Sequence, residues 1–140
     1  MSTLLGSCHC GAVRVSYDTA VEPQRTSPRA CDCAFCRKHG AAWISDFAGR
    51  LSIGANAGAL RAYRQGSNSA DFLLCEHCGV LVAVMYEHAG GRHAAVNASC
   101  LDAAGDFAPT QPSSPQRLDR DEKVARWLRL WVPNVRIDTR

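Results

Sequence analysis

Seven of the eight cysteines lie in three short clusters whose spacing is typical of metal ligands. A triplet, CDCAFC at residues 31–36, places three sulfurs in one short loop. The other two clusters are pairs followed by glycine, CHCG at residues 8–11 and CEHCG at residues 75–79. Cysteines two or three positions apart cannot easily bridge one another, but they can direct their sulfurs at one ion. The sequence therefore predicts metal binding, and sets of thiolates with this spacing are typical of zinc.

The two pairs predict one closed site. The CEHCG segment resembles a zinc knuckle, in which two thiolates sit on a tight turn and a glycine relieves the bend. It needs two more ligands, and Cys8 and Cys10 would project to the same side if they lie on an extended strand. Closed sites with four thiolates are structural. We therefore expect a structural zinc on Cys8, Cys10, Cys75 and Cys78 rather than disulfides, which need an oxidising compartment.

The triplet supplies three ligands to a metal that takes four. Three protein ligands and one exchangeable position are the arrangement of catalytic zinc. We therefore predict a second zinc with an open position on Cys31, Cys33 and Cys36. The alternative is that the isolated Cys100 closes this site, which would make the chain a non-catalytic zinc-binding interaction module with two structural zinc ions. The ligand in the fourth position separates the two hypotheses.

The elements that must position these clusters are predicted to be short antiparallel strands. Residues 12–17 alternate apolar and polar side chains, which is typical of a half-buried strand. Residues 34–39 predict a short helical turn that ends at Gly40. Further strands, separated by glycine-containing turns, are expected at 42–47, 50–53, 60–64, 71–75, 80–86 and 93–98. The fold class is therefore expected to be mainly β with one or two short helices, in a single domain over residues 1–140.

The C-terminal third has a different pattern. Residues 106–117 hold three of the six prolines and predict an extended, exposed connection rich in proline and serine. Asp119 or Asp121 can cap a helix after it, and Pro133 would end that helix. Its apolar packing face would consist of Val124, Trp127, Leu128 and Trp131.

Composition argues against two classes of partner. The net charge of +3 is small and the basic residues are scattered, so no nucleic acid is expected to bind. No apolar run approaches the ~20 residues that span a bilayer, so no membrane partner is expected. The N-terminal MSTLLGSCHC lacks the pattern of a signal peptide, which makes a cytoplasmic, reducing location the default expectation.

The order of the three motifs is similar to that of a known family. GSCHCGAV at residues 6–13, CDCAFCRKHG at 31–40 and CEHCG at 75–79 together resemble the glutathione-dependent formaldehyde-activating enzyme family, which includes the centromere protein V domain. The resemblance covers about residues 3–100 and implies a β-tent fold. Asp32 stands where the family often has histidine. The resemblance also implies a structural zinc on Cys8, Cys10, Cys75 and Cys78 and a substrate-facing zinc on Cys31, Cys33 and Cys36.

The function implied by this resemblance is that of a carbon–sulfur lyase acting on glutathione–aldehyde adducts, similar to S-hydroxymethylglutathione synthase. Glutathione would be the co-substrate, and an aldehyde such as formaldehyde would be the other small-molecule partner. A thiol that coordinates zinc loses its proton near neutral pH, so glutathione at the open position would attack the carbonyl carbon. Arg37 and Lys38, beside the last ligand, are expected to pair with the carboxylates of glutathione. The second zinc is expected to be partly occupied, and a homo-oligomer is compatible with this scheme.

Overall fold

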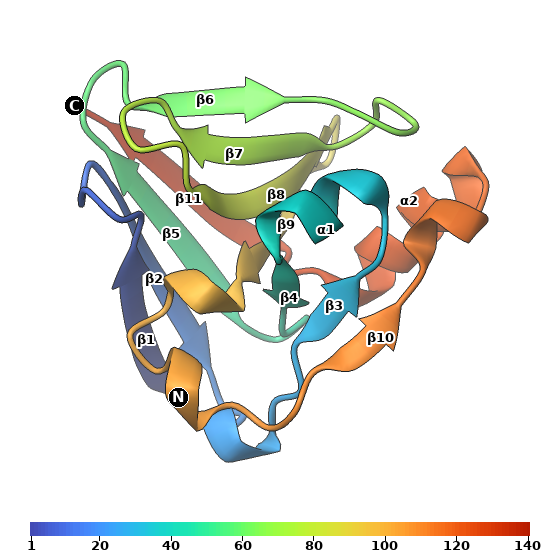
Figure 1. Ribbon diagram of the computed structural model, residues 1–140, viewed down its shortest axis with the longest axis horizontal. Helices are drawn as coiled ribbons and strands as arrows, with labels where there is room; N and C mark the ends of the chain where they lie inside the picture. The colour runs from blue at the N-terminus through green and yellow to red at the C-terminus, as the bar shows by residue number, and fades with distance from the viewer.

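The computed structural model describes residues 1–140 and arranges them in two β-sheets (Figure 1). One sheet has four strands in the order β1-β2-β5-β11. These strands are β1 (Ser2–Ser7), β2 (Val13–Thr19), β5 (Arg50–Ala55) and β11 (Asn134–Thr139). The pairs β1–β2 and β2–β5 are antiparallel, whereas β11 runs parallel to β5. The prediction of a mainly β fold is confirmed.

The second sheet has seven strands in the order β10-β3-β4-β9-β8-β7-β6. They are β3 (Arg29–Cys31), β4 (Ala42–Ile44), β6 (Leu60–Tyr63), β7 (Asp71–Cys75), β8 (Leu81–His88), β9 (Gly91–Asn97) and β10 (Gln111–Ser113). All neighbours are antiparallel except β10, which runs parallel to β3. Because β3 ends at Cys31, this pairing places the C-terminal third of the chain directly beside the cysteine triplet.

Two α-helices lie on the outer side of the seven-stranded sheet, away from β1 and β2 (Figure 1). Helix α1 (Ala34–His39) begins at Cys33, whose sulfur accepts a hydrogen bond from the Cys36 N–H, and ends at Gly40 in the left-handed conformation. Helix α2 (Arg120–Leu130) begins with a capping box between Asp119 and Glu122. The remaining helical turns are 3-10 helices: η1 (Pro23–Arg25), η2 (Ala98–Cys100), η3 (Ala104–Asp106) and η4 (Pro115–Arg117). No helix has the length and hydropathy needed to cross a bilayer.

The seven-stranded sheet is covered on both faces. Along β8, Val82 and Met85 belong to the core that lies between the two sheets, and Leu81 and Val84 belong to a second core on the outer face. A central strand buried on both faces is expected to be continuously apolar rather than alternating, and Leu81 to Met85 are all buried. The second core is formed by the outer face of this sheet, α1 and the end of α2, and it contains the triplet.

Two local expectations are wrong. Cys8 and Cys10 do not lie on an extended strand; they lie on the turn between β1 and β2, because Gly11 at φ +82° reverses the chain there. Leu128 is exposed, because the buried face of α2 is rotated toward Leu130. The segment expected as an extended connection over 106–117 contains the extended strand β10 and the 3-10 helix η4, and none of its residues is buried. We call residues 111–117 the strap.

Candidate metal centres and the cavity beside them

The two cysteine pairs bring four sulfurs together. The sulfurs of Cys8, Cys10, Cys75 and Cys78 all lie within 4.8 Å of one another. The Sγ atoms of Cys8 and Cys10 are 3.7 Å apart, and those of Cys10 and Cys75 are 3.6 Å apart. A zinc ion at about 2.3 Å from four tetrahedral sulfurs requires sulfur–sulfur distances of about 3.8 Å. We call this set the tetrad, and its geometry fits a four-coordinate zinc.

Each pair of the tetrad sits on a turn that a glycine completes. Gly11 and Gly79 have φ angles of +82° and +78°, and their N–H groups donate to the carbonyls of Cys8 and Cys75 at 3.3 and 2.8 Å. The open space around both α-carbons shows that the positive φ, and not crowding, is what requires glycine. One turn joins β1 to β2 and the other joins β7 to β8, so a metal in the tetrad would link the two sheets.

Within the tetrad, the pKa values of Cys78 and Cys10 shift in opposite directions, so these two thiols do not ionise equally in the absence of a cation. Burial opposes ionisation of Cys78, but the N–H groups of Val80 and Cys10 and the neighbouring thiols lower its pKa to about 6. The Ala12 N–H favours the Cys10 thiolate, but loss of water and the neighbouring thiols outweigh it and raise that pKa to about 11. Like charges at this distance cannot all ionise alone, and a divalent cation would remove that obstacle.

The triplet forms a second cluster on the outer face of the large sheet. The sulfurs of Cys31, Cys33 and Cys36 lie within 4.8 Å of one another, with no further metal-binding side chain in the group. Cys31 ends β3, Cys33 caps α1, and Cys36 lies within α1, so the strand-to-helix turn directs all three inward. A hydrogen bond from the Cys36 thiol lowers the pKa of Cys31 to about 6, and the same bond raises the pKa of Cys36. The donor set is one that zinc takes in three-ligand sites.

Cys100 does not approach the triplet. Its thiol donates to the carbonyl of Leu81 at 3.3 Å, and the side chain is buried in the core between the sheets, which also holds Cys8 and Cys75. The triplet belongs to the other core, on the opposite face of the sheet. The alternative in which Cys100 supplies a fourth ligand to the triplet is therefore wrong, because the seven-stranded sheet stands between them.

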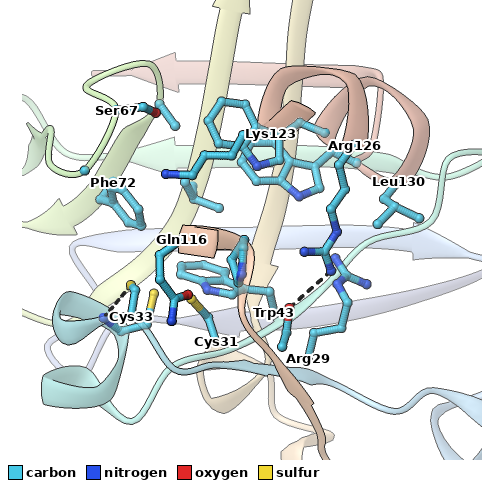
Figure 2. Close-up of a pocket in the computed structure, with 18 of the residues that line it drawn as sticks. Arg29, Cys31, Cys33, Trp43, Ser67, Phe72, Gln116, Lys123, Arg126 and Leu130 are labelled. Atoms are coloured by element: carbon cyan, nitrogen blue, oxygen red, sulfur yellow. Dashed lines mark hydrogen bonds between the residues drawn. The ribbon is translucent and has the colours of Figure 1, made fainter. Parts of the chain in front are cut away.

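A cavity of about 110 Å³ opens beside the triplet (Figure 2). Figure 2 shows Cys31 and Cys33 on one side of this cavity and Arg126 and Leu130 on the other. Much of its wall is apolar: Trp43, Ala70, Phe72, Val84, Trp127, Leu130 and Trp131. Trp127 and Trp131 were expected only to pack α2 onto the domain. Their stacked rings, with centroids 4.9 Å apart, also line the cavity.

Three basic residues and no acidic residue line the cavity. Arg29 donates from Nη2 to Ser45 Oγ at 2.8 Å. Arg126 donates from Nη2 to Ser113 Oγ at 3.1 Å (Figure 2). Lys123 is the third, and none of the three forms an ion pair. Burial and the nearby Arg126 lower the pKa of Arg29. An anion bound in the cavity would compensate this unfavourable concentration of positive charge.

Arg37 and Lys38 lie outside the cavity. Both are exposed in the last turn of α1, and neither is among the residues that line the space beside the triplet. Their position directly after Cys36 in the sequence favours a place near the substrate, but the fold does not put them there. The helix turns them toward solvent, since Cys36 itself occupies the buried side. The basic residues that do line the cavity come from β3 and α2, and no local motif in the sequence indicated them.

The strap completes the cavity and is joined to the triplet by Asp32. The Asp32 carboxylate accepts hydrogen bonds from the Ser114 hydroxyl at 2.8 Å and from the Gln116 amide. The backbone N–H of Asp32 donates to the Ser113 carbonyl at 2.9 Å. The bonds from Gln116 and Ser114 lower the pKa of Asp32. Ser113, Pro115 and Gln116 line the cavity, so Asp32 and the pairing of β10 with β3 together hold the strap beside the triplet.

Comparison with known proteins identifies the family of this chain. The family model for the glutathione-dependent formaldehyde-activating enzyme matches residues 3–114, from β1 into the strap. No curated protein matches the chain. Among solved structures, the crystal structure of a Rhodobacter sphaeroides protein, a structural-genomics target, is similar at 25% sequence identity with a TM-score of 0.55, covering 76% of this chain and 99% of that chain. The matched residues include the cysteines of the tetrad and of the triplet, and the chain belongs to the glutathione-dependent formaldehyde-activating enzyme family.

Proposed function

We propose that this protein is a zinc-dependent enzyme of the carbon–sulfur lyase type, which joins the thiol of glutathione to an aldehyde. The reaction would resemble that of S-hydroxymethylglutathione synthase. The observation that carries the proposal is the convergence of the Cys31, Cys33 and Cys36 sulfurs beside a cavity, with no fourth protein ligand within reach. Family membership supports glutathione-dependent formaldehyde activation as the general chemistry.

The tetrad and the triplet would have separate roles. Zinc in the tetrad would be structural and would hold the β1–β2 turn against the β7–β8 turn, so that one β-tent domain folds around it. The triplet would hold the second zinc with one position left for substrate. Zinc bound there supplies a coordination position at which a thiol loses its proton near neutral pH. Eight free cysteines are compatible with the reducing cytoplasm that we expected.

The side chains of the cavity would bind and orient the substrates. Arg29, Lys123 and Arg126 would pair with the carboxylates of glutathione, since charge-assisted hydrogen bonds to arginine are among the stronger ones available. The strap would cover the thiol, and Gln116 would offer its amide to the glutathione backbone. Trp127, in α2, and Trp131, which follows the helix, would form an apolar wall of the site. Orientation matters most here, because glutathione and formaldehyde already combine without a catalyst.

The bond changes are those of a simple addition. The sulfur of glutathione forms a bond to the carbonyl carbon, and the carbon–oxygen double bond becomes a single bond. The proton that leaves the thiol is matched by one that the new alkoxide takes from water, since no acidic side chain lines the cavity. No oxidant or reductant takes part.

Exchange spectroscopy by nuclear magnetic resonance tests the proposal. Free glutathione and S-hydroxymethylglutathione interconvert in the presence of formaldehyde, and zinc-loaded protein should accelerate this exchange over the spontaneous rate. Cys33→Ser should lose the acceleration, whereas Cys100→Ala should keep it. Fully zinc-loaded protein that leaves the exchange rate unchanged and takes up no glutathione in calorimetry would overturn the proposal.

A further inference from the structure

The wall of the cavity next to the triplet is more apolar than formaldehyde requires. Trp43 and Phe72 are almost completely buried, at 7% and 9% exposure, and their rings lie edge to face with centroids 6.3 Å apart. Both rings belong to the same buried cluster as Cys31 and Cys36, and they line the same cavity. An apolar surface therefore begins at the sulfur cluster itself. Formaldehyde carries only hydrogens on its carbonyl carbon and would leave this surface in contact with water.

Glutathione does not match this surface either. It is a polar tripeptide with two carboxylates, an ammonium group and two amides. Placing its amides against indole and phenyl rings would remove their hydrogen bonds to water without replacing them, which is unfavourable. The groups that suit glutathione are Arg29, Lys123 and Arg126, which Figure 2 shows across the cavity from Cys33. The apolar surface remains for the other substrate.

We propose that the carbonyl substrate is an aldehyde with an apolar substituent, a short alkyl chain or a single ring, which packs against Trp43, Phe72 and Trp127. This proposal rests on the function proposed above and specifies its second substrate. The attack of the glutathione thiol on R–CHO forms the same carbon–sulfur bond as with formaldehyde. The carbonyl oxygen becomes the hydroxyl group, and only the group R differs.

The volume of the cavity sets an upper limit on the size of the substituent, because glutathione would share the same space. The cavity volume is about 110 Å³, and an engineered apolar cavity of about 150 Å³ is known to admit benzene. Two small residues, Ala70 and Val84, both 3% exposed, leave the space free beside the rings of Phe72 and Trp43. A larger residue at either position would fill it. The site therefore suits a substituent no larger than a single ring.

The rate of adduct formation over a series of aldehydes tests this inference. With glutathione at a fixed concentration, the catalysed exchange rate is compared for formaldehyde, ethanal, propanal, butanal and benzaldehyde, each corrected for its spontaneous rate. Each methylene that becomes buried should raise kcat/KM about fourfold until the cavity is full. Activity that is highest with formaldehyde and falls steadily along the series would overturn the inference and leave the proposed function intact. Absence of activity with every aldehyde would overturn both.

Binding of stable adduct analogues gives a second measurement that does not depend on turnover. S-methyl-, S-butyl- and S-benzylglutathione carry the same carbon–sulfur bond as the product but do not decompose. Calorimetry should show tighter binding of the butyl and benzyl compounds than of the methyl compound. Equal affinities for the three compounds would contradict the inference.

Variants of the cavity wall test whether these residues cause the preference for an apolar substituent. Ala70→Leu, which fills the cavity, and Trp127→Ala, which removes one of its rings, should each lower the ratio of S-benzyl to S-methyl affinity at least fivefold. Leu128→Ala is the matched control, because Leu128 lies on the exposed side of the same helix, and it should leave the ratio unchanged. If Trp127→Ala fails to fold, the affinity ratio of Ala70→Leu still tests the inference. An unchanged ratio in a folded Ala70→Leu protein would overturn the inference.

Discussion

The Asp32 carboxylate accepts a hydrogen bond at 2.8 Å from the hydroxyl of Ser114, which lies 82 positions later in the chain. This contact joins the loop of the triplet to the strap, and the Gln116 amide donates to the same carboxylate. A residue between two cysteines of the triplet therefore connects the sulfur cluster to the part of the chain that lines the other side of the cavity.

Replacing Asp32 should loosen the strap without removing metal. Asp32→Ala deletes both hydrogen bonds from the strap but leaves the three sulfurs in place. We expect a several-fold higher KM for glutathione, faster proteolysis within 111–117 and an unchanged zinc content. Asp138→Ala is a suitable control, because Asp138 is exposed on β11 and pairs only with Arg136. Loss of zinc from Asp32→Ala would contradict the assignment of this residue to the strap.

Charge removal on α2 should weaken the binding of glutathione. Arg126→Gln keeps a hydrogen-bond donor near Ser113 but removes the positive charge from the cavity. We expect the KM for glutathione to rise about tenfold, as is typical when a hydrogen bond to a charged group is lost. Arg129→Gln, on the exposed side of the same helix, should have little effect. Equal effects of the two variants would indicate general electrostatic attraction instead of a binding contact.

Gly6 should tolerate no side chain. A Cβ atom there would overlap the carbonyl oxygen of Cys100 and approach Cα of Leu101 within 2.7 Å, because β1 passes directly over η2. Gly6→Ala should lower the free energy of unfolding by about 2 kcal/mol, as overpacking of a filled core does. Gly105→Ala, which meets no atom within 4 Å, provides the comparison in urea denaturation. A stability equal to that of the native chain would show that β1 shifts readily.

Cys100 should be dispensable for metal binding. Its thiol contacts the Leu81 carbonyl and lies on the other face of the sheet from the triplet. Cys100→Ala should keep two zinc ions per chain by atomic emission and lose only the small stabilisation of a buried side chain. A protein with one zinc ion would show that Cys100 is a ligand after all.

Much of the fold could be predicted from the sequence because its strands follow simple patterns. The alternation in β2, the glycine at the end of α1 and the cap at Asp119 are local signals, and the structure has each feature where it was expected. Strand β1 was missed because its residues are mostly exposed at a sheet edge and show no clear alternation. Strand β11 was missed for a related reason, since it joins β5 by a long-range parallel pairing that no local pattern encodes.

The sulfur clusters were predictable because ligand spacing is local, but the cavity was not. Arg29, Trp43, Gln116 and Arg126 come from separate elements. The pairing of β10 with β3 and the packing of the end of α2 against β9 bring the last two beside the first two. Proximity to Cys36 in the sequence favoured Arg37 and Lys38 as the residues that bind glutathione. A cavity wall depends on tertiary packing, and its residues carry no common spacing in the chain.

If the tetrad holds the domain together and the triplet presents an open metal position, loss of a cysteine from each cluster will have a different effect. The decisive measurement is the zinc content per chain together with urea denaturation, for the native protein, Cys33→Ser and Cys78→Ser. We predict two zinc ions in the native protein and one in a Cys33→Ser protein that unfolds cooperatively near the native midpoint but has no activity. Cys78→Ser should be strongly destabilised, since removing a ligand of a structural zinc removes folding free energy. Loss of both metals and equal destabilisation in the two variants would contradict the account.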